Sequence, residues 1–287
     1  IYKCGNEAQK QKYLPAMASM EKIGCFGLTE PESGSDASNL STTATRKANG
    51  WVLNGQKRWI GNGTFADIYI IWAMNAETKQ VNGFIVEKGT PGLTSTKIEN
   101  KIGLRCVQNA DIYLTDCFVT DDCRLPLATN FATGPGNCLF LTRLSTAWIA
   151  CGMALGALES ALEYTKQRKQ FGQPLAKLQI IQERLARMLS ICQSTALLVW
   201  RASVMCDDGK LSLGQVGLCK AHATSQARVV VSLAREIVGG NGMLTDYLVG
   251  KHFVDIEGLH TFEGSYDINV LVGMRELTGQ SAIKPRK

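Results

Sequence analysis

The apolar residues in the second half of the chain follow a helical spacing over many turns. From about residue 136 to residue 278 they recur every three or four positions, the spacing of one buried helix face. The first stripe comprises Leu141, Leu144, Trp148, Cys151, Leu155, Leu158 and Leu162. Because long amphipathic helices with short connections pack side by side, the spacing predicts an antiparallel helical bundle. We assign residues 133–287 to it.

The preceding part of the chain has a β pattern. Short apolar runs at 67–74, 83–86 and 110–114 are rich in β-forming residues. The turn signals between such runs are Asn49-Gly50, Asn54-Gly55, 61–63, Asn82-Gly83 and Pro91-Gly92. Short strands with turns at this spacing predict a central β-barrel or sandwich, which we place at residues 23–132. Residues 1–22 have a helical pattern and are interpreted as the end of an N-terminal helical domain. The expected class is therefore α+β with several domains.

Composition argues against several kinds of partner. The 287 residues carry a net charge of +6 that is spread along the chain, which does not favour nucleic acid. The ten Cys form no CxxC pair and keep no metal-ligand spacing with the three His, so we expect no metal site and a reducing compartment. The uncharged apolar stretch at 144–158 is too short to span a bilayer, so we expect no membrane. Because the chain begins at Ile1, we expect it to start inside a longer protein.

The ten residues 27–36 are the first candidate for a binding loop. They read Gly-Leu-Thr-Glu-Pro-Glu-Ser-Gly-Ser-Asp and follow an apolar run at 23–26 that predicts a strand. Such a loop exposes backbone N–H groups and hydroxyls together, which suits a phosphate or a flavin edge. The alternative is an ordinary polar turn.

Four further elements each have a functional and a structural interpretation. Trp59, before a Gly-rich turn, could cover a flat ring or belong to the β core. Arg168, at the end of a predicted helix, could grip a phosphate or neutralise the helix dipole. The glycines of 238–242 could allow close approach to a ligand or form a helix C-cap. Glu263, between Phe262 and Gly264, could be a poised base or a surface carboxylate before a helix at 266–277.

These elements together resemble the acyl-CoA dehydrogenase and oxidase flavoprotein superfamily in order and spacing. The matching motifs are Gly-Leu-Thr-Glu-Pro-x-Ser-Gly-Ser-Asp, Trp-Ile-x-Asn, Arg-x-x-Phe-Gly, Gly-Gly-Asn-Gly and Glu-Gly-x-x-Asp. The resemblance runs from residue 1 to about 280 and looks closest to the plant peroxisomal short-chain acyl-CoA oxidases and the glutaryl-CoA dehydrogenase branch. It implies a helical domain largely absent here, a central β-domain, and a C-terminal antiparallel four-helix bundle. It also implies a homo-oligomer, either a dimer or a tetramer.

The resemblance also implies a set of FAD-binding and substrate-binding residues. The flavin edge and ring would contact Phe26, Leu28, Thr29, Trp59, Ile60 and Gly61. FAD would be held across a subunit interface by Arg168, Phe171, Gln179, Glu236, Gly239 and Gly240, and on its adenine side by Ser265 and Asp267. Ser35 would lie where pyrophosphate and CoA approach, and Arg143 and Gly264 would contact the substrate.

Glu263 falls on the family's catalytic base. The implied reaction is FAD-dependent α,β-dehydrogenation of an acyl-CoA thioester, the first step of fatty acid β-oxidation. A second branch of the family takes its base from the position that Thr142 occupies here. Threonine cannot act as a carboxylate base, and this favours Glu263. Two departures from the family pattern are Gly61, where Thr or Ser is usual, and Phe262, where Tyr is common.

The expected function is a short-chain acyl-CoA oxidase that passes electrons to O2 in the peroxisome. The first alternative is an acyl-CoA or glutaryl-CoA dehydrogenase that uses an electron-transfer flavoprotein in the mitochondrial matrix. The others are a truncated, non-catalytic member that serves as an interaction module, and a relative that oxidises a non-CoA substrate.

Overall fold

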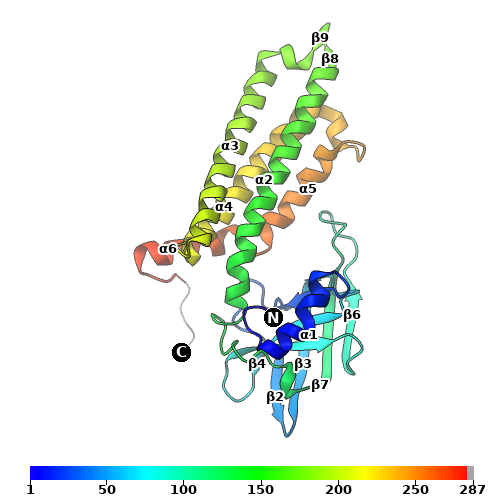
Figure 1. The fold of residues 1–287 in the computed structure, drawn as a ribbon. Helices are drawn as coiled ribbons and strands as arrows, with labels where there is room; N and C mark the ends of the chain where they lie inside the picture. The colour runs from blue at the N-terminus through cyan, green and yellow to red at the C-terminus, as the bar shows by residue number, and fades with distance from the viewer. Residues whose placement is uncertain (283–287) are drawn as a thin grey trace. The chain divides into compact units, whose positions relative to one another are not determined.

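The computed structural model describes residues 1–282 and divides into two compact units. One comprises residues 1–101 and 105–139, and the other comprises residues 102–104 and the chain from 140 onward. The first unit is mainly a sheet and the second is helical, as Figure 1 shows. The expected mixed α+β class is therefore confirmed. The division into three domains stays a prediction.

The first unit is built on one curled seven-stranded sheet. Its strands are β1 (Gly24–Gly27), β2 (Thr43–Lys47), β3 (Gly50–Gly61), β4 (Ile68–Asn75), β5 (Val81–Glu87), β6 (Leu93–Lys97) and β7 (Asn109–Thr120). The order is β1-β4-β2-β3-β7-β6, and β5 pairs with β4. Residues Tyr69 and Ile71 of β4 enter one apolar cluster, whereas Ile70 and Trp72 enter another. Because both faces of β4 are covered, its sequence is a continuous apolar run.

Three of the predicted turns are confirmed and two are wrong. Asn49-Gly50 joins β2 to β3, residues 61–63 end β3, and Pro91-Gly92 separates β5 from β6. Asn54-Gly55 instead lies inside β3 at a bulge, where a Cβ on Gly55 would lie 2.5 Å from Thr42 Oγ1. Asn82-Gly83 lies inside β5, where a Cβ on Gly83 would lie 2.7 Å from the Trp72 ring. Close packing, and not chain reversal, requires glycine at both positions.

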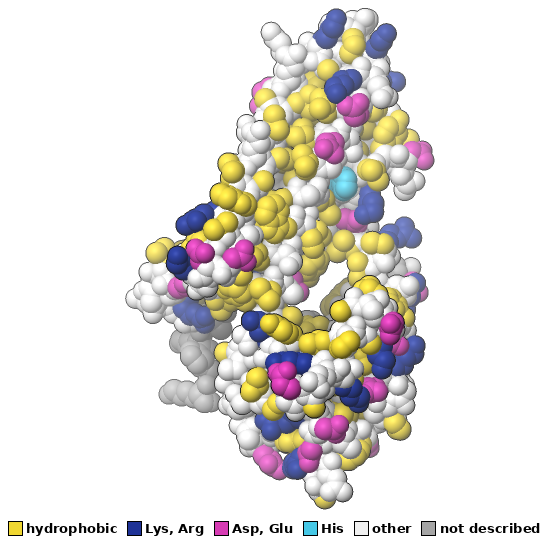
Figure 2. Space-filling view, in the orientation of Figure 1, with side chains coloured by type: hydrophobic (Ala, Val, Ile, Leu, Met, Phe, Trp, Pro, Cys, Tyr) yellow, Lys and Arg dark blue, Asp and Glu magenta, His cyan; other side chains and the backbone are white. Residues whose placement is uncertain are grey.

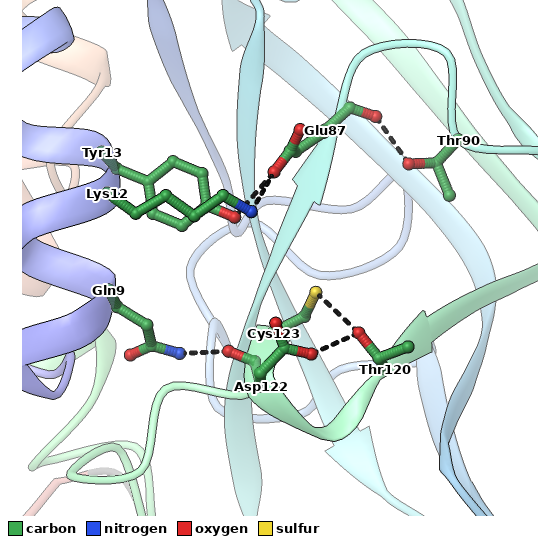
Figure 3. Close-up of polar contacts among 8 residues, drawn as sticks. All are labelled: Gln9, Lys12, Tyr13, Glu87, Thr90, Thr120, Asp122 and Cys123. Atoms are coloured by element: carbon green, nitrogen blue, oxygen red, sulfur yellow. Dashed lines mark hydrogen bonds and ion pairs between the residues drawn. The ribbon is translucent and has the colours of Figure 1, made fainter.

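Helix α1 (Glu7–Ala18) packs on the sheet of the same unit, as Figure 3 shows. Gln9 Nε2 donates to the carbonyl of Asp122 at 2.6 Å. Lys12 Nζ and Tyr13 Oη both donate to Glu87 Oε1 at 2.8 Å. Tyr13 is buried in the same apolar cluster as Ile70. The helix expected in residues 1–22 is therefore present. Its origin in a separate helical domain stays a prediction.

The helical unit has one apolar core to which four helices contribute. The α-helices of this unit are α2 (Pro135–Gln167), α3 (Gln179–Asp207), α4 (Leu213–Val238), α5 (Leu248–Thr261) and α6 (Tyr266–Thr278). The core draws side chains from α2, α3, α4 and α5, and α6 packs against α4. Helix α5 was not expected as a separate element, because only Val249, Ile256 and Leu259 of its apolar residues enter this core.

Helices α2 and α3 also expose large apolar side chains. These include Trp148, Ile149, Leu155, Leu189, Leu197 and Trp200, which are 41–64% exposed. Figure 2 shows hydrophobic side chains spread over the visible face of the helical unit. In length and composition alone both helices would pass as membrane-spanning, a test that core helices of folded domains also pass. Both contribute to the apolar core.

A buried ion pair fixes the loop that follows β1. Lys57 Nζ lies 2.7 Å from Glu30 Oε1, and the two side chains are 0% and 2% exposed. Lys57 Nζ also donates to the carbonyl of Leu28 at 3.2 Å, and the backbone N–H of Thr42 donates to Glu30 Oε1 at 2.9 Å. Burial alone would raise the pKa of Glu30, but the nearby Lys57 charge and these donors outweigh it and lower the pKa. The pair is therefore charged and ties loop 27–36 to β3.

We expect Lys57→Met to lower the free energy of unfolding by about 3–5 kcal/mol, because it leaves the Glu30 carboxylate buried and unpaired. Urea unfolding followed by tryptophan fluorescence measures the loss. The matched control is Lys12→Met, whose pair with Glu87 is 56% and 43% exposed and should cost less than about 1 kcal/mol. Adding Glu30→Gln to Lys57→Met should recover part of the loss. An unchanged loss in that double variant would contradict the explanation.

Candidate active site

The Glu263 carboxylate lies on a tight loop between α5 and α6. Glu263 has a φ of 56° and Gly264 a φ of 84°, both in the left-handed region. A left-handed conformation is uncommon for a residue other than glycine and costs energy unless its surroundings impose it. The carboxylate is half-buried, and its Oε2 accepts a hydrogen bond from Thr142 Oγ1 of α2 at 2.5 Å. Ser265, and not Glu263, is the N-cap of α6.

Three buried side chains hold the backbone of this loop. Lys220 Nζ donates to the carbonyls of Gly264 at 2.8 Å and His260 at 3.2 Å. Asn269 Nδ2 donates to the carbonyls of Gly264 at 2.7 Å, Ser265 at 3.1 Å and Glu263 at 3.3 Å. Arg143 Nε donates to the carbonyl of Glu263 at 3.4 Å. We call Lys220, Asn269 and Arg143 the carbonyl clamp; their exposures are 0%, 0% and 6%.

The clamp places two cations beside one carboxylate. Burial lowers the pKa of Lys220 to about 8, with the Glu263 charge acting against this shift and Arg143 adding to it. Burial also lowers the pKa of Arg143, again opposed by Glu263. Lys220 therefore remains mostly protonated at neutral pH. A carboxylate fixed in this way is suited to accept a proton from a bound molecule.

No sequence pattern singled out Lys220 and Asn269. A lone lysine in a helix usually lies at the surface, yet Lys220 falls on the same stripe as Val216, Ala223 and Ala227, all buried. That position on an apolar stripe was the available signal. Arg143 was expected to contact a substrate. In the structure its guanidinium is buried against the Glu263 backbone, so the substrate contact stays a prediction.

The first unit brings several of its candidate residues to the end of β3 and the loop after β1. Trp59 is 51% exposed with a φ of 66°, so it is not a core tryptophan. Thr29 is half-buried, and its carbonyl accepts from Arg58 N at 2.8 Å. The remaining candidates divide as follows: Ser35 is exposed, Phe26 and Gly61 are half-buried, and Leu28 and Ile60 are in the core. Ligand contacts by Leu28 and Ile60 would therefore come from their backbone atoms.

The other candidates in the helical unit lie at its two ends. Arg168 and Phe171 lie at the hairpin of β8 (Lys169–Gln170) and β9 (Gln173–Pro174), and Phe171 is 90% exposed with a φ of 52°. Gln179, Gly239 and Gly240 are also exposed; Gly239 is the C-cap of α4, and Glu236 lies 3.5 Å from Arg184. Ser265 and Asp267 begin α6. Figure 1 shows the hairpin at the opposite end of this unit from α6, so one helical unit does not gather both sets.

The exposed candidates fit a flat, anionic cofactor. Trp59 and Phe171 hold aromatic rings in solvent on left-handed backbone, although both are large apolar side chains. Arg168, exposed beside Phe171, supplies a forked donor that suits phosphate. In residues 1–282, no group of three or more His, Cys, Asp or Glu could hold a metal ion.

Two family models match the chain. One is described as "Acyl-CoA dehydrogenase, middle domain" and matches residues 25–117, and the other as "Acyl-CoA dehydrogenase, C-terminal domain" and matches residues 136–278. Human mitochondrial short-chain specific acyl-CoA dehydrogenase is 36% identical over 95% of this chain. The chain spans 67% of the length of that relative.

Solved structures agree with the family models. Glutaryl-CoA dehydrogenase from Mycobacterium smegmatis in complex with FADH2 matches with a TM-score of 0.96 and 33% identity, over 99% of this chain and 73% of that one. A structure described as an electron transferring flavoprotein of Acidaminococcus fermentans contains a chain that matches with a TM-score of 0.93 and 34% identity. That match covers 98% of this chain and 74% of that chain.

We expect Gly264→Ala to destabilise the helical unit more than Gly172→Ala does. Both positions have positive φ, which costs about 1 kcal/mol for a residue with a Cβ. A Cβ on Gly264 would lie 2.9 Å from Asn269 Nδ2, whereas nothing lies within 4 Å of one on Gly172. The crowding should add about 1–3 kcal/mol. Thermal unfolding of both variants measures the difference, and equal losses would show that the clamp does not constrain Gly264.

Proposed function

The chain belongs to the acyl-CoA dehydrogenase family, and from this premise we propose that it catalyses FAD-dependent α,β-dehydrogenation of acyl-CoA thioesters. The single observation that supports this most directly is the Glu263 carboxylate. It lies on a left-handed loop fixed by buried donors, with one oxygen bonded to Thr142. A carboxylate fixed to this degree acts as a positioned base better than a mobile surface group does.

Glu263 is the catalytic base in this proposal. It takes the proton from the substrate's α-carbon, which the thioester carbonyl makes acidic, and a double bond forms as hydride leaves the β-carbon. FAD, when bound, supplies the acceptor for that hydride. The hydrogen bond from Thr142 to Oε2 restrains the carboxylate. Oε1 is the oxygen that takes the proton in this proposal. Backbone N–H of Glu263 donates to the thioester carbonyl and stabilises negative charge there.

The residues proposed to hold FAD are the candidates that the family resemblance implies. In the first unit these are Phe26, Thr29, Ser35, Trp59 and Gly61, with the backbone of Leu28 and Ile60. In the helical unit they are Arg168, Phe171, Gln179, Glu236, Gly239 and Gly240 at one end, and Ser265 and Asp267 at the other. Arg143 and Gly264 are the proposed substrate contacts.

We propose a homo-oligomer, a dimer or a tetramer, in which two subunits complete each FAD site. The hairpin at Arg168 and the start of α6 lie at opposite ends of one helical unit, so one FAD cannot reach both within it. The exposed apolar residues of α2 and α3 supply a surface for self-association. An antiparallel four-helix bundle formed by α2–α5 and a barrel-like closure of the sheet remain parts of this proposal.

The comparisons favour the dehydrogenase alternative over the oxidase that the sequence resemblance suggested. The human relative and the Mycobacterium smegmatis relative are both named dehydrogenases, and the human one is mitochondrial and short-chain specific. We therefore propose a short-chain acyl-CoA substrate, an electron-transfer flavoprotein as acceptor, and the mitochondrial matrix in place of the peroxisome. A glutaryl-CoA substrate is the second candidate, because the structural match with a glutaryl-CoA dehydrogenase covers 99% of this chain.

We expect Glu263→Gln to slow anaerobic reduction of bound FAD by butyryl-CoA by about 10²- to 10⁴-fold, because glutamine cannot accept the α-proton. Stopped-flow loss of flavin absorbance measures the rate. Glu159→Gln, an exposed carboxylate on α2, is the matched control and should keep the original rate. A flavin-loaded Glu263→Gln protein that is reduced at the original rate would disprove the assignment. A purified protein that never retains flavin would favour the non-catalytic module.

We expect the reduced protein to pass its electrons to an electron-transfer flavoprotein and to release little hydrogen peroxide in air. Turnover with butyryl-CoA is followed with each acceptor, together with a peroxide assay. Peroxide formed in proportion to butyryl-CoA would restore the oxidase interpretation. Turnover with glutaryl-CoA and not butyryl-CoA would favour the second candidate.

A further inference from the structure

We propose that Lys220 is a positioning residue for the Glu263 carboxylate. This inference rests on the proposed role of Glu263. It adds a buried lysine on α4 whose ammonium donates to backbone carbonyls. Lys220 acts through two backbone carbonyls, one on each side of Glu263 in the sequence: His260 before it and Gly264 after it.

The first reason is geometric. An isolated Glu263 would leave its left-handed φ of 56°, because extended and right-handed conformations are lower in energy for a residue with a Cβ. Lys220 holds the last turn of α5 and the residue after Glu263 from a single ammonium group, at 3.2 and 2.8 Å. Because the backbone is fixed on both sides of Glu263, the position of its Cα and the direction of its Cα–Cβ bond are fixed as well. Asn269 reinforces only the later part of the loop, from Glu263 to Ser265.

The second reason is that packing at this position does not require a charged group. Lys220 is 0% exposed on a helix face that otherwise carries Val216, Ala223 and Ala227. A methionine would fill a similar volume without the desolvation cost of a charge. We therefore attribute the buried cation to its hydrogen bonds, which go to the two carbonyls that flank the proposed base.

The third reason is electrostatic. Lys220 and the Glu263 carboxylate interact favourably, and the other cation acting on both is Arg143. Removing Lys220 takes one of the two cations from beside the carboxylate. The charged and titratable groups around Lys220 and its partner His260 are Glu263, Arg143, Arg228, Glu257 and Asp267. All of them remain in a Lys220 variant.

The test compares Lys220→Met with Thr224→Val. Thr224 lies one turn further along α4, is also 0% exposed, and donates to the carbonyl of Lys220 at 3.0 Å and contacts the His260 ring, but not the Glu263 loop carbonyls. Both variants lose buried hydrogen bonds, so both report general destabilisation of the helix. Only Lys220→Met loosens the loop and removes the charge.

For Lys220→Met we expect anaerobic flavin reduction by butyryl-CoA to slow by about 10- to 100-fold per bound flavin, because a small misplacement of a base is costly. The butyryl-CoA concentration at half-maximal rate should change little. Thr224→Val should leave the rate unchanged.

A second readout needs no flavin and no turnover. Hydrogen–deuterium exchange of the flavin-free protein should speed up across residues 261–266 in Lys220→Met and stay unchanged there in Thr224→Val. This separates loosening of the loop from loss of cofactor.

Each outcome decides the proposal. An unchanged rate and unchanged loop exchange in Lys220→Met, alongside a slow Glu263→Gln, would overturn the role of Lys220 and leave Glu263 as the base. A fast Glu263→Gln would instead overturn the proposed function itself. If Lys220→Met yields no flavin-loaded protein, Lys220→Gln, which keeps a donor without charge, decides. Failure of both to fold, while Thr224→Val folds, would show that Lys220 serves folding alone and would overturn the proposal.

Discussion

Each unit of this protein depends on a lysine ammonium that has been removed from water. An ammonium buried without partners is expensive, so each must find acceptors, and those acceptors become fixed in turn. Lys57 finds Glu30 and the carbonyl of Leu28, which fixes the loop after β1. Lys220 finds two carbonyls around Glu263. The two loops with the most informative sequence motifs are thus both fixed by buried cations.

The sequence predicted the elements in which the local pattern of apolar residues matches the burial of each position. The run at 67–74 became β4 because both its faces are covered, and the helix at 266–277 became α6. Asn54-Gly55 and Asn82-Gly83 were misread because a glycine required by a neighbouring side chain looks the same in sequence as a glycine required by a turn. At the site, motif order identified Glu263. The contact of Thr142 and the burial of Lys220 depend on packing between distant helices, which no local pattern contains.

Three candidate site residues lie on strained backbone. Trp59, Phe171 and Glu263 all have positive φ, as do six other residues besides glycine in the described part of the chain. Glu263 is over-determined by hydrogen bonds from three buried side chains, whereas Trp59 and Phe171 are exposed. The loop that carries the proposed base is therefore held by the protein's own side chains. The two aromatics present their rings to solvent, where a flat ligand could cover them.

The separation of the Arg168 hairpin from the start of α6 has a consequence for how the protein is loaded. If two subunits complete each FAD site, cofactor binding and subunit association are thermodynamically linked, and each strengthens the other. Flavin occupancy then depends on protein concentration as well as on FAD. Dilution would release the cofactor even when its own concentration is held constant. The exposed apolar surface of α2 and α3 would thereby set the amount of active enzyme.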